Sequence, residues 1–255
     1  MKRPCQSIKI SIITVVLNGE ETIQNTIDSV LVQTYQNIEY IIIDGSSTDG
    51  TIGVVKSYGD KITAFVSEPD KGIYDGLNKG VSLATGDVVA FLHSDDTYAS
   101  DAIVQKIADK FIQDDELDGV YGDLIYTPKD DTLKIIRYWK SNDFNIKLLK
   151  KGWMPAHPTL FLRREVYKKY GKFDLDFKIS GDYDFMLRVL SAGIIVKYIP
   201  EVLYKMKVGG ESNKSLKNII QKSKEDLKAL NNNNIGGIRT LVYKNISKII
   251  QFVRR

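Results

Sequence analysis

The strongest constraint on the fold is an alternation of strand-like and helix-like segments along the first hundred residues. Residues 8–17 (IKISIITVVL) form an almost continuous β-branched run, typical of a strand covered on both faces. Residues 18–33 place Ile23, Ile27 and Val30 at helical spacing, and we expect Asn18 to cap that helix. Further strand and helix patterns alternate up to residue 94. Short links between them favour an α/β fold with a mostly parallel central sheet flanked by helices.

The alternation loosens after residue 100. The patterns predict helices over 101–112, 164–170 and 183–192, and strands over 119–126, 133–139, 159–163 and 194–200. A turn at 127–131 joins the first two of these strands. Two helices, separated by NNNNIGG at 231–237, are expected to close the chain.

Cysteine content, apolar runs and charge distribution indicate the compartment and the kind of partner that we expect. The 255 residues include one cysteine, so no internal disulfide can form, and no apolar run is long enough to span a membrane. No basic-then-apolar signal segment opens the sequence, so we expect a cytoplasmic protein. Residues 201–255 carry 12 Lys and Arg against four acids, whereas the rest of the chain is net acidic. That asymmetry indicates contact with an anionic surface, and an acidic body makes nucleic acid a poor partner.

Acidic residues gather where the predicted parallel strands end, which is where open α/β sheets bind ligands. Asp95 and Asp96 come just after the strand at 86–93, and such carboxylates suit Mg²⁺ or Mn²⁺ shared with a diphosphate. The alternative is that they cap the next helix or lie in a solvated loop. Asp44 could accept a hydrogen bond from a base or ribose, or simply shape the turn before Gly45. Neither a Walker A sequence nor G-x-G-x-x-G is present.

Several stretches in the right order resemble glycosyltransferase family 2. They are TVVLNGEETIQNTIDSVLVQTYQNIEYIIIDGSSTDGT (14–51), EPDKGIYDGLNKGVSLATGDVVAFLHSDD (68–96), HPTLFLRREVYKKYGKFD (157–174) and SGDYDFMLRVL (180–190). The resemblance implies one GT-A type domain over residues 1–205. Its nucleotide-sugar-binding half would be 8–100 and its acceptor-side half 101–205, followed by a basic helical extension at 206–255. It also implies inverting transfer of a hexosyl residue from a nucleoside diphosphate sugar, most often a UDP-sugar, to a hydroxyl.

The resemblance also assigns residues to the donor site. Asp95 matches the metal-binding acid of the D-x-D motif, with Mn²⁺ or Mg²⁺ as cofactor, while His93 replaces the motif's first acid. The residues expected to bind the nucleotide or donor are Thr14, Val16, Asn18, Asp44, Asp70, Tyr74, Asp75, Asn78, Asp95 and Asp96.

Asp182 matches the family's general base, although Gly181 stands where relatives usually have Glu. The alternative is that Asp182 only stabilises the start of a helix, and Asp184 is the second candidate for the base. His157 and Trp153 fall where the acceptor is expected.

The C-terminal segment 236–255 has an apolar side and a basic side at helical spacing. The apolar side comprises Ile238, Leu241, Val242, Ile246, Ile249, Ile250 and Val253, and the basic side Arg239, Lys244, Lys248 and Arg255. Such a helix suits an anionic bilayer, or else packs on the catalytic body. A membrane surface agrees with an acceptor on a polyprenyl diphosphate carrier in surface polysaccharide synthesis.

Two other functions are compatible with parts of this pattern. A sugar nucleotidyltransferase would also join a nucleotide fold to Mg²⁺, but residues 8–20 lack the glycine-rich loop expected of one. A non-catalytic subunit that binds sugar nucleotides is the other alternative, because His93 and Gly181 depart from the catalytic motifs.

Overall fold

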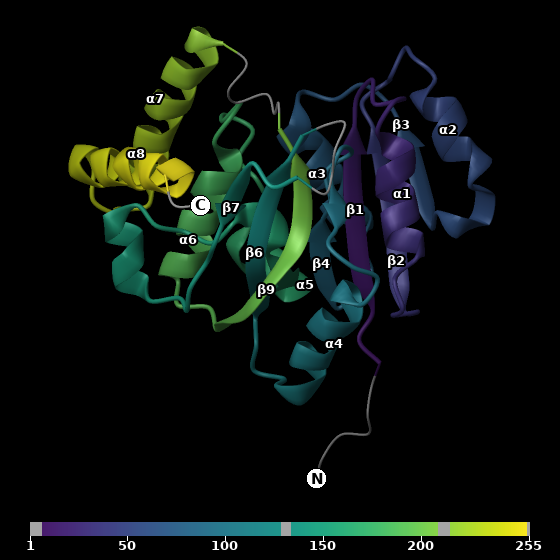
Figure 1. Ribbon diagram of the computed structural model, residues 1–255, viewed down its shortest axis with the longest axis horizontal. Coiled ribbons are helices and arrows are strands. Elements are labelled where there is room, and N and C mark those ends of the chain that lie inside the picture. The colour runs from purple at the N-terminus through teal and green to yellow at the C-terminus, as the bar shows by residue number, and fades with distance from the viewer. Residues whose placement is uncertain (1–6, 129–133, 209–214, 254–255) are drawn as a thin grey trace.

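A computed structural model describes residues 7–128, 134–208 and 215–253, with backbone alone at residues 216 and 247–253 (Figure 1). The first half contains β1 (Ile10–Val16), α1 (Ile23–Leu31), β2 (Ile38–Asp44), α2 (Thr51–Ser57), η1 (Gly59–Lys61), β3 (Ala64–Ser67), α3 (Ile73–Leu83), β4 (Val88–Phe91), β5 (Thr97–Tyr98) and α4 (Ile103–Gln113). The second half contains β6 (Gly119–Thr127), β7 (Arg137–Trp139), η2 (Ile146–Lys151), η3 (His157–Thr159), β8 (Phe161–Arg163), α5 (Arg164–Tyr170), α6 (Gly181–Ser191), β9 (Val196–Lys207), α7 (Leu216–Asn232) and α8 (Ile238–Val253).

One sheet runs through the molecule in the order β3-β2-β1-β4-β8-β6-β9-β5, and β7 pairs with β6. The strands β3, β2, β1 and β4 are parallel, as the alternating pattern predicts. Beyond β4 the sheet is mixed, because β8 runs antiparallel to both β4 and β6 while β6 and β9 are parallel. The fold is therefore α/β with a central sheet, parallel in its first half and mixed in its second.

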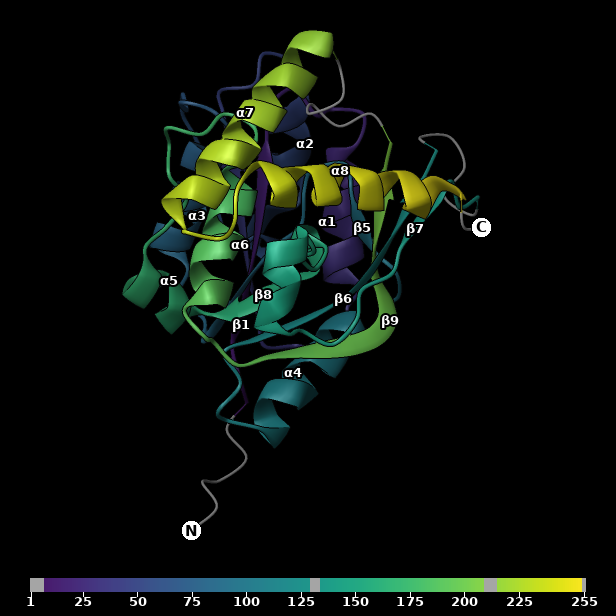
Figure 2. The ribbon, with the colours of Figure 1, turned by 90° about the vertical axis from the view of Figure 1, so that its left-hand side faces the viewer.

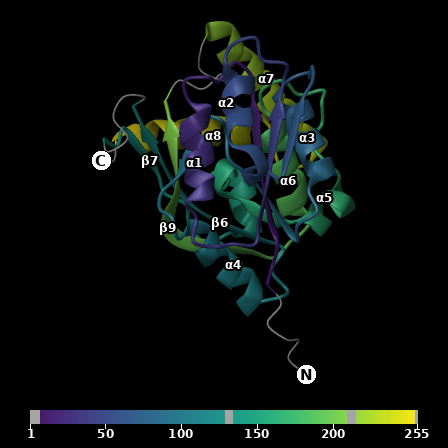
Figure 3. The ribbon, with the colours of Figure 1, turned by 90° about the vertical axis from the view of Figure 1, so that its right-hand side faces the viewer.

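Helices cover both faces of this sheet because its strands are apolar on both sides. The strands β1 and β2 are buried at almost every position. One core packs α3, α5 and α6 against side chains such as Ile13 and Ile41, and the other packs α1 and α4 against Ile12 and Ile42. Figure 3 shows the side of the molecule where α1, α2 and α3 lie. This burial fixes the strand ends, and therefore the loops that follow them.

The C-terminal helices pack on the second half of the domain. Figure 2 brings α7 and α8 to the front, and α7 lies against α6 while α8 lies against η2 and β7. The strand β9 runs through residue 205, where we predicted the domain to end. The helices that were expected to form an extension are thus attached directly to the element that carries Asp182.

Two local expectations are corrected, and one short strand was not expected. Asn18 does not cap α1, which begins at Ile23 after Thr22. Instead Asn18 has φ +52, and its side chain bonds to the next loop. The strand expected at 194–200 extends to Lys207, and the two-residue strand β5 was not anticipated. The predicted turn at 127–131 lies largely outside the described residues.

Candidate active site

The loops that follow β2 and β3 meet at the carboxyl edge of the sheet. The Ser67 hydroxyl donates to Asp44 across the two strand ends, with an Oγ–Oδ2 distance of 2.6 Å. The carboxylate of Asp70 lies over Gly45 so closely that a Cβ on that glycine would be 2.6 Å from Asp70 Oδ2. Asp70 also accepts the Gly72 amide at 2.9 Å. Gly45 therefore allows the two loops to approach and brings Asp70 to the strand end.

Asp44 is fully buried, and its carboxylate accepts hydrogen bonds from the loop that follows it. It accepts hydrogen bonds from the Ser47 amide at 3.0 Å, from the Ser47 hydroxyl and from Ser67. Asn18 holds the same loop, because its Oδ1 accepts the Thr48 amide at 2.8 Å. In this conformation both side chains shape the 46–48 turn, and direct contact with a nucleotide remains a prediction.

Three other predicted donor-site residues also have structural partners. Thr14 is buried and donates to the Leu92 carbonyl at 2.8 Å, and Val16 lies in the core. Asn78 pairs with the backbone of Phe173 in both directions, at 2.9 Å each. These contacts hold the surrounding segments together, and direct contact of the three side chains with the donor remains a prediction.

The start of α3 carries a small charged group. Asp75 accepts the Lys71 amide at 3.1 Å and lies 3.5 Å from the ammonium of Lys79. Lys79 also pairs with Glu68 at 3.0 Å. Asp75 is therefore a helix-start acid with a cation beside it, and it lies in the turn next to Tyr74.

The segment after β4 contains the predicted metal ligand. Asp95 is partly exposed, whereas Asp96 is fully buried, and its Oδ1 accepts the Lys207 amide at 3.3 Å. Burial, together with the neighbouring charge of Asp95, raises the pKa of Asp96 well above its usual value. Asp96 therefore points into the protein, and only Asp95 of the pair offers an accessible carboxylate.

A divalent cation could bind at this segment if Asp95 and the phosphates of the substrate coordinate it together. No cluster of three or more His, Cys, Asp or Glu side chains within the described residues could hold a metal. A single accessible carboxylate suits Mg²⁺ or Mn²⁺, since such sites complete their shell with water and substrate phosphates. Burial lowers the pKa of His93 despite the charges of Asp95 and Asp182, so its imidazole is a neutral neighbour.

Asp182, in the first turn of α6, contacts side chains from two other segments. Its Oδ2 lies 3.0 Å from His157 Nδ1, and its Oδ1 lies 3.0 Å from the Tyr74 hydroxyl. The rings of His157 and His93 meet edge to face, with 6.1 Å between their centroids. The base candidate is thus linked through His157 to the segment that carries Asp95, and through Tyr74 to the segment that carries Asp75.

Charge and hydrogen bonding keep Asp182 ionised. Burial disfavours the charged form, but His157, Lys222 and the Tyr74 hydroxyl outweigh it and hold the pKa of the carboxyl below its usual value. About a quarter of the side chain remains exposed. Asp182 is therefore an accessible carboxylate in its basic form at neutral pH.

Gly181 is explained by its neighbour Tyr74. A Cβ at residue 181 would lie 2.9–3.0 Å from three carbons of the Tyr74 ring, closer than real Cβ contacts allow. The aromatic ring therefore occupies the space where a side chain at position 181 would begin. The loss of the usual Glu thus accompanies a tyrosine whose hydroxyl reaches Asp182.

Comparison with known proteins identifies the family. The model of "Glycosyl transferase family 2" matches residues 11–171. The chain belongs to glycosyltransferase family 2. A "PGL/p-HBAD biosynthesis glycosyltransferase" of Mycobacterium bovis is 30% identical over 240 residues, covering 91% of this chain and 88% of that protein. The enzyme class expected from the sequence, a glycosyltransferase, is confirmed.

Solved structures show the same fold. TarS of S. aureus in complex with UDP-GlcNAc superposes with a TM-score of 0.68 at 19% identity, covering 88% of this chain and 64% of that one. A mannosyltransferase from Pyrobaculum calidifontis, in complex with GDP-Man and Mn²⁺, superposes with a TM-score of 0.67 at 17% identity. The match covers 91% of this chain and 66% of that one. This chain spans 43% of the longer TarS chain. The GT-A type fold expected from the sequence is thereby confirmed.

Two residues considered for this family's chemistry have other environments. Asp184 is buried and turned towards the C-terminal helices, where it accepts from Asn233 at 2.9 Å. Burial raises the pKa of Asp184, so it is a poor alternative to Asp182 as the base. Trp153 stacks on Phe144 at 6.4 Å between centroids and is partly buried. Contact between Trp153 and the acceptor remains a prediction.

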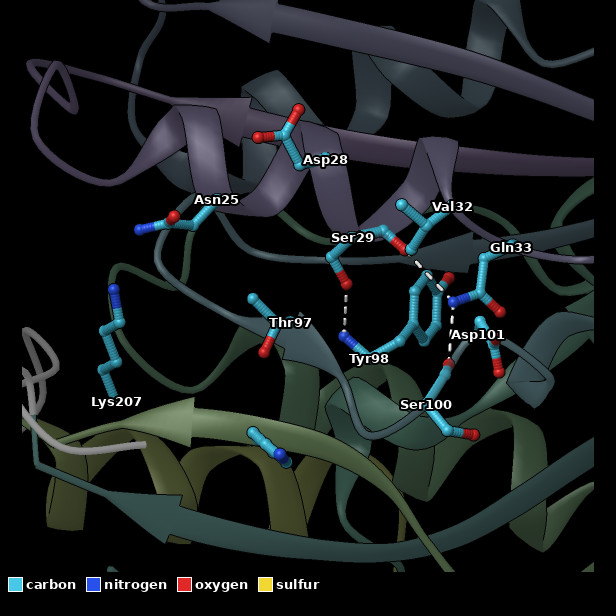
Figure 4. A pocket seen from close by; sticks show the side chains of 11 residues that line it. Asn25, Asp28, Ser29, Val32, Gln33, Thr97, Tyr98, Ser100, Asp101 and Lys207 are labelled. Atoms are coloured by element: carbon cyan, nitrogen blue, oxygen red, sulfur yellow. Dashed lines mark hydrogen bonds between the residues drawn. The ribbon is translucent and has the colours of Figure 1, made fainter. Parts of the chain in front are cut away.

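A pocket of about 440 Å³ lies between α1, β5 and β9 (Figure 4), and neither Asp95 nor Asp182 lines it. Its polar side chains hold the chain around β5, since Ser29 accepts the Tyr98 amide at 2.7 Å and Gln33 donates to the Ser100 carbonyl at 2.8 Å. Lys207 also lines this pocket, and its backbone amide donates to Asp96 Oδ1. The pocket contains none of the predicted family 2 site residues, and we do not assign the reaction to it.

Proposed function

We propose that this glycosyltransferase moves a hexosyl residue from a nucleoside diphosphate sugar to an acceptor hydroxyl, with inversion at the anomeric carbon. The observation that carries the proposal is the position of Asp182. It is ionised, partly exposed and linked through His157 and His93 to the Asp95 segment. A base on one side of the sugar and a charged diphosphate site on the other is the arrangement that single displacement needs.

In the proposed step, Asp182 removes the proton of the acceptor hydroxyl as its oxygen bonds to C1 of the donor sugar. The bond between C1 and the diphosphate oxygen breaks, and the diphosphate leaves with the electron pair. The proton remains on Asp182 until it passes to water. The Tyr74 and His157 hydrogen bonds orient the carboxylate for this transfer.

The donor side would be formed by Asp70, Tyr74, Asp75 and Asp95 at the strand ends. A divalent cation held by Asp95, when bound, supplies positive charge beside the leaving diphosphate. We take UDP as the nucleotide, since the chain shares its fold with TarS, which binds UDP-GlcNAc. A nucleotidyltransferase is disfavoured by the family match.

We further propose that the acceptor is carried on a lipid at the cytoplasmic face of the membrane. No helix in the described part of the chain is long and apolar enough to cross a bilayer. The helix α8 packs on the body through Thr240 and Lys244, while Ile238, Val242 and Ile246 are 48–69% exposed. This orientation corrects the expectation that Lys244 belongs to an outward basic face. The side chains of Lys248, Ile249, Ile250, Val253 and Arg255 lie outside the described residues.

The exposed apolar stripe of α8 supports a peripheral membrane contact. Tyr243, 59% exposed, and the exposed Arg239 border the stripe, which matches an interfacial helix beside anionic headgroups. A polyprenyl diphosphate-linked saccharide, as in surface polysaccharide synthesis, would be presented there.

The test is release of nucleotide by the purified full chain. We would supply UDP-glucose, UDP-galactose, UDP-GlcNAc and GDP-mannose with Mn²⁺, after ranking donors by thermal shift with and without the ion. We expect turnover with a UDP-sugar, and a loss on the order of 10²-fold or more in Asp182→Asn. Asp95→Ala should weaken donor binding as well. Undiminished turnover by Asp182→Asn would refute the assigned base.

A further inference from the structure

The loop that precedes the base candidate is bound by a carboxylate from the C-terminal helices. Glu225, in α7, is 4% exposed. Its Oε2 accepts the backbone amides of Ile179 at 2.8 Å and Ser180 at 2.9 Å, and both of its oxygens lie 3.1 Å from the Lys178 amide. Three consecutive N–H groups directly before α6 thus share one acceptor.

These amides need an external partner because residues 178–180 lie in no helix or strand. A buried backbone N–H without an acceptor is costly, and the N-cap residue Ser180 makes no side-chain capping bond of its own. Gln221, one turn earlier in α7, donates to Glu225 Oε1 at 2.8 Å and fixes the carboxylate. Burial disfavours the charge of Glu225, but these hydrogen bonds outweigh it and lower its pKa.

The same loop is held from the opposite side by the donor half of the domain. The hydroxyl of Tyr74 lies 2.7 Å from the Ile179 carbonyl and 3.0 Å from Asp182 Oδ1. The peptide at Ile179 is therefore held between α3 through its carbonyl and α7 through its amide. Asp182 lies three residues further along, in the first turn of α6, so its position depends on both contacts.

We propose that Glu225 is a positioning residue for the base, and that α7 is part of the catalytic unit. The inference rests on the proposed role of Asp182. Glu225 touches no reacting atom; it fixes the backbone from which Asp182 projects, and the neighbouring Lys222 adds a charge that favours the ionised base.

The key variant is Glu225→Ala, which leaves three buried amides without their acceptor. We expect kcat, measured with the UDP-sugar that the wild-type enzyme turns over, to fall on the order of 10²-fold, as a displacement near 1 Å can produce. The affinity for UDP and Mn²⁺ should stay within about twofold, since Asp70, Asp75 and Asp95 are untouched. Glu225→Gln keeps one acceptor oxygen and should stay within about tenfold of wild type.

Glu39 provides a matched control for lost stability. It is also a buried glutamate with several hydrogen bonds, but it lies at the amino end of β2, away from the site. Glu39→Ala should unfold more easily and yet keep the wild-type kcat at temperatures where it is folded. Equal losses of kcat in the two alanine variants, at equal folded fraction, would overturn the positioning role.

Amide hydrogen exchange gives a readout that does not need turnover. Exchange at residues 178–180 should rise by at least tenfold in Glu225→Ala and stay unchanged in Glu39→Ala. Unchanged exchange in Glu225→Ala would overturn the inference. If Asp182→Asn retains activity, the base assignment fails and the positioning role with it. If Asp182→Asn is inactive while Glu225→Ala is fully active, only the positioning role fails.

Discussion

Glu39 should make the stability of this enzyme depend on pH in a way that can be isolated. Its carboxylate is buried and accepts from Lys9 at 2.8 Å, from Ser11 at 2.6 Å, and from the amide and hydroxyl of Thr85 at 2.7 and 2.6 Å. Burial alone would raise its pKa, but these bonds outweigh it and lower the pKa to about 2.

The magnitude follows from that value. A fall from 4.5 to about 2 corresponds to about 3 kcal/mol of folding free energy, at 1.36 kcal/mol per pKa unit. Because the folded pKa is the lower one, this stability is fully present above pH 4.5 and is lost as the pH falls towards 2. Between pH 6 and pH 3 the contribution should shrink by about 2 kcal/mol.

The perturbation is Glu39→Gln, and the assay is urea denaturation of wild type and variant at pH 6 and pH 3. We expect the wild type to be more stable by about 3 kcal/mol at pH 6 and by about 1 kcal/mol at pH 3. Comparing the two proteins at each pH removes the contribution of all other carboxylates. A stability gap that is the same at both pH values would refute the reasoning.

Four further outcomes are expected. Tyr74→Phe removes the hydroxyl that contacts Asp182 and the Ile179 carbonyl but keeps the ring on the donor side, so kcat should fall on the order of tenfold while UDP binding, measured by titration, falls less. Gly181→Glu forces a Cβ against the Tyr74 ring and should cost about 2 kcal/mol in urea denaturation, with activity below wild type. EDTA should abolish nucleotide release and excess Mn²⁺ should restore it, since the described residues offer no cluster of three metal ligands that would hold the ion tightly. Val242→Ser with Ile246→Ser should weaken co-sedimentation with anionic vesicles at least tenfold, whereas Val32→Ser, at an exposed valine directly after α1, should not. Equal vesicle binding by all variants would exclude α8 as the contact.

The first half of the fold was predictable because β1, β2 and β4 are buried on both faces and helices link the strands along the chain. The apolar runs at β1 and β2 could hardly pack in any other way, and their parallel pairing is confirmed. The second half depends on contacts between distant segments. Nothing local in residues 194–207 indicates that β9 extends to Lys207 beside β6.

The candidate site shows the same limit. The sequence identified Asp182, Tyr74 and His157 separately, by resemblance, but their contacts arise only when α3, η3 and α6 converge. Glu225 carried no signal at all, because a glutamate in an amphipathic helix is usually a solvated one.

The orientation of α8 could not be read from its periodicity. Helical spacing separates an apolar side from a basic side but does not say which side is covered. The helix α7 supplies Asp226, 2.8 Å from the ammonium of Lys244, and α6 supplies the ring of Tyr183 against the same ammonium. These partners make the lysine the buried residue and leave Val242 and Ile246 outside.

The contact between the Tyr74 ring and Gly181 has an evolutionary consequence. Two positions far apart in the chain share one volume, so neither can accept a larger side chain unless the other gives way. Among descendants of a common ancestor, a bulky aromatic at the first position should therefore be inherited together with glycine or another minimal residue at the second. Chains that carry glutamate at the second position should have a smaller or displaced residue at the first, and must then anchor their base by different means.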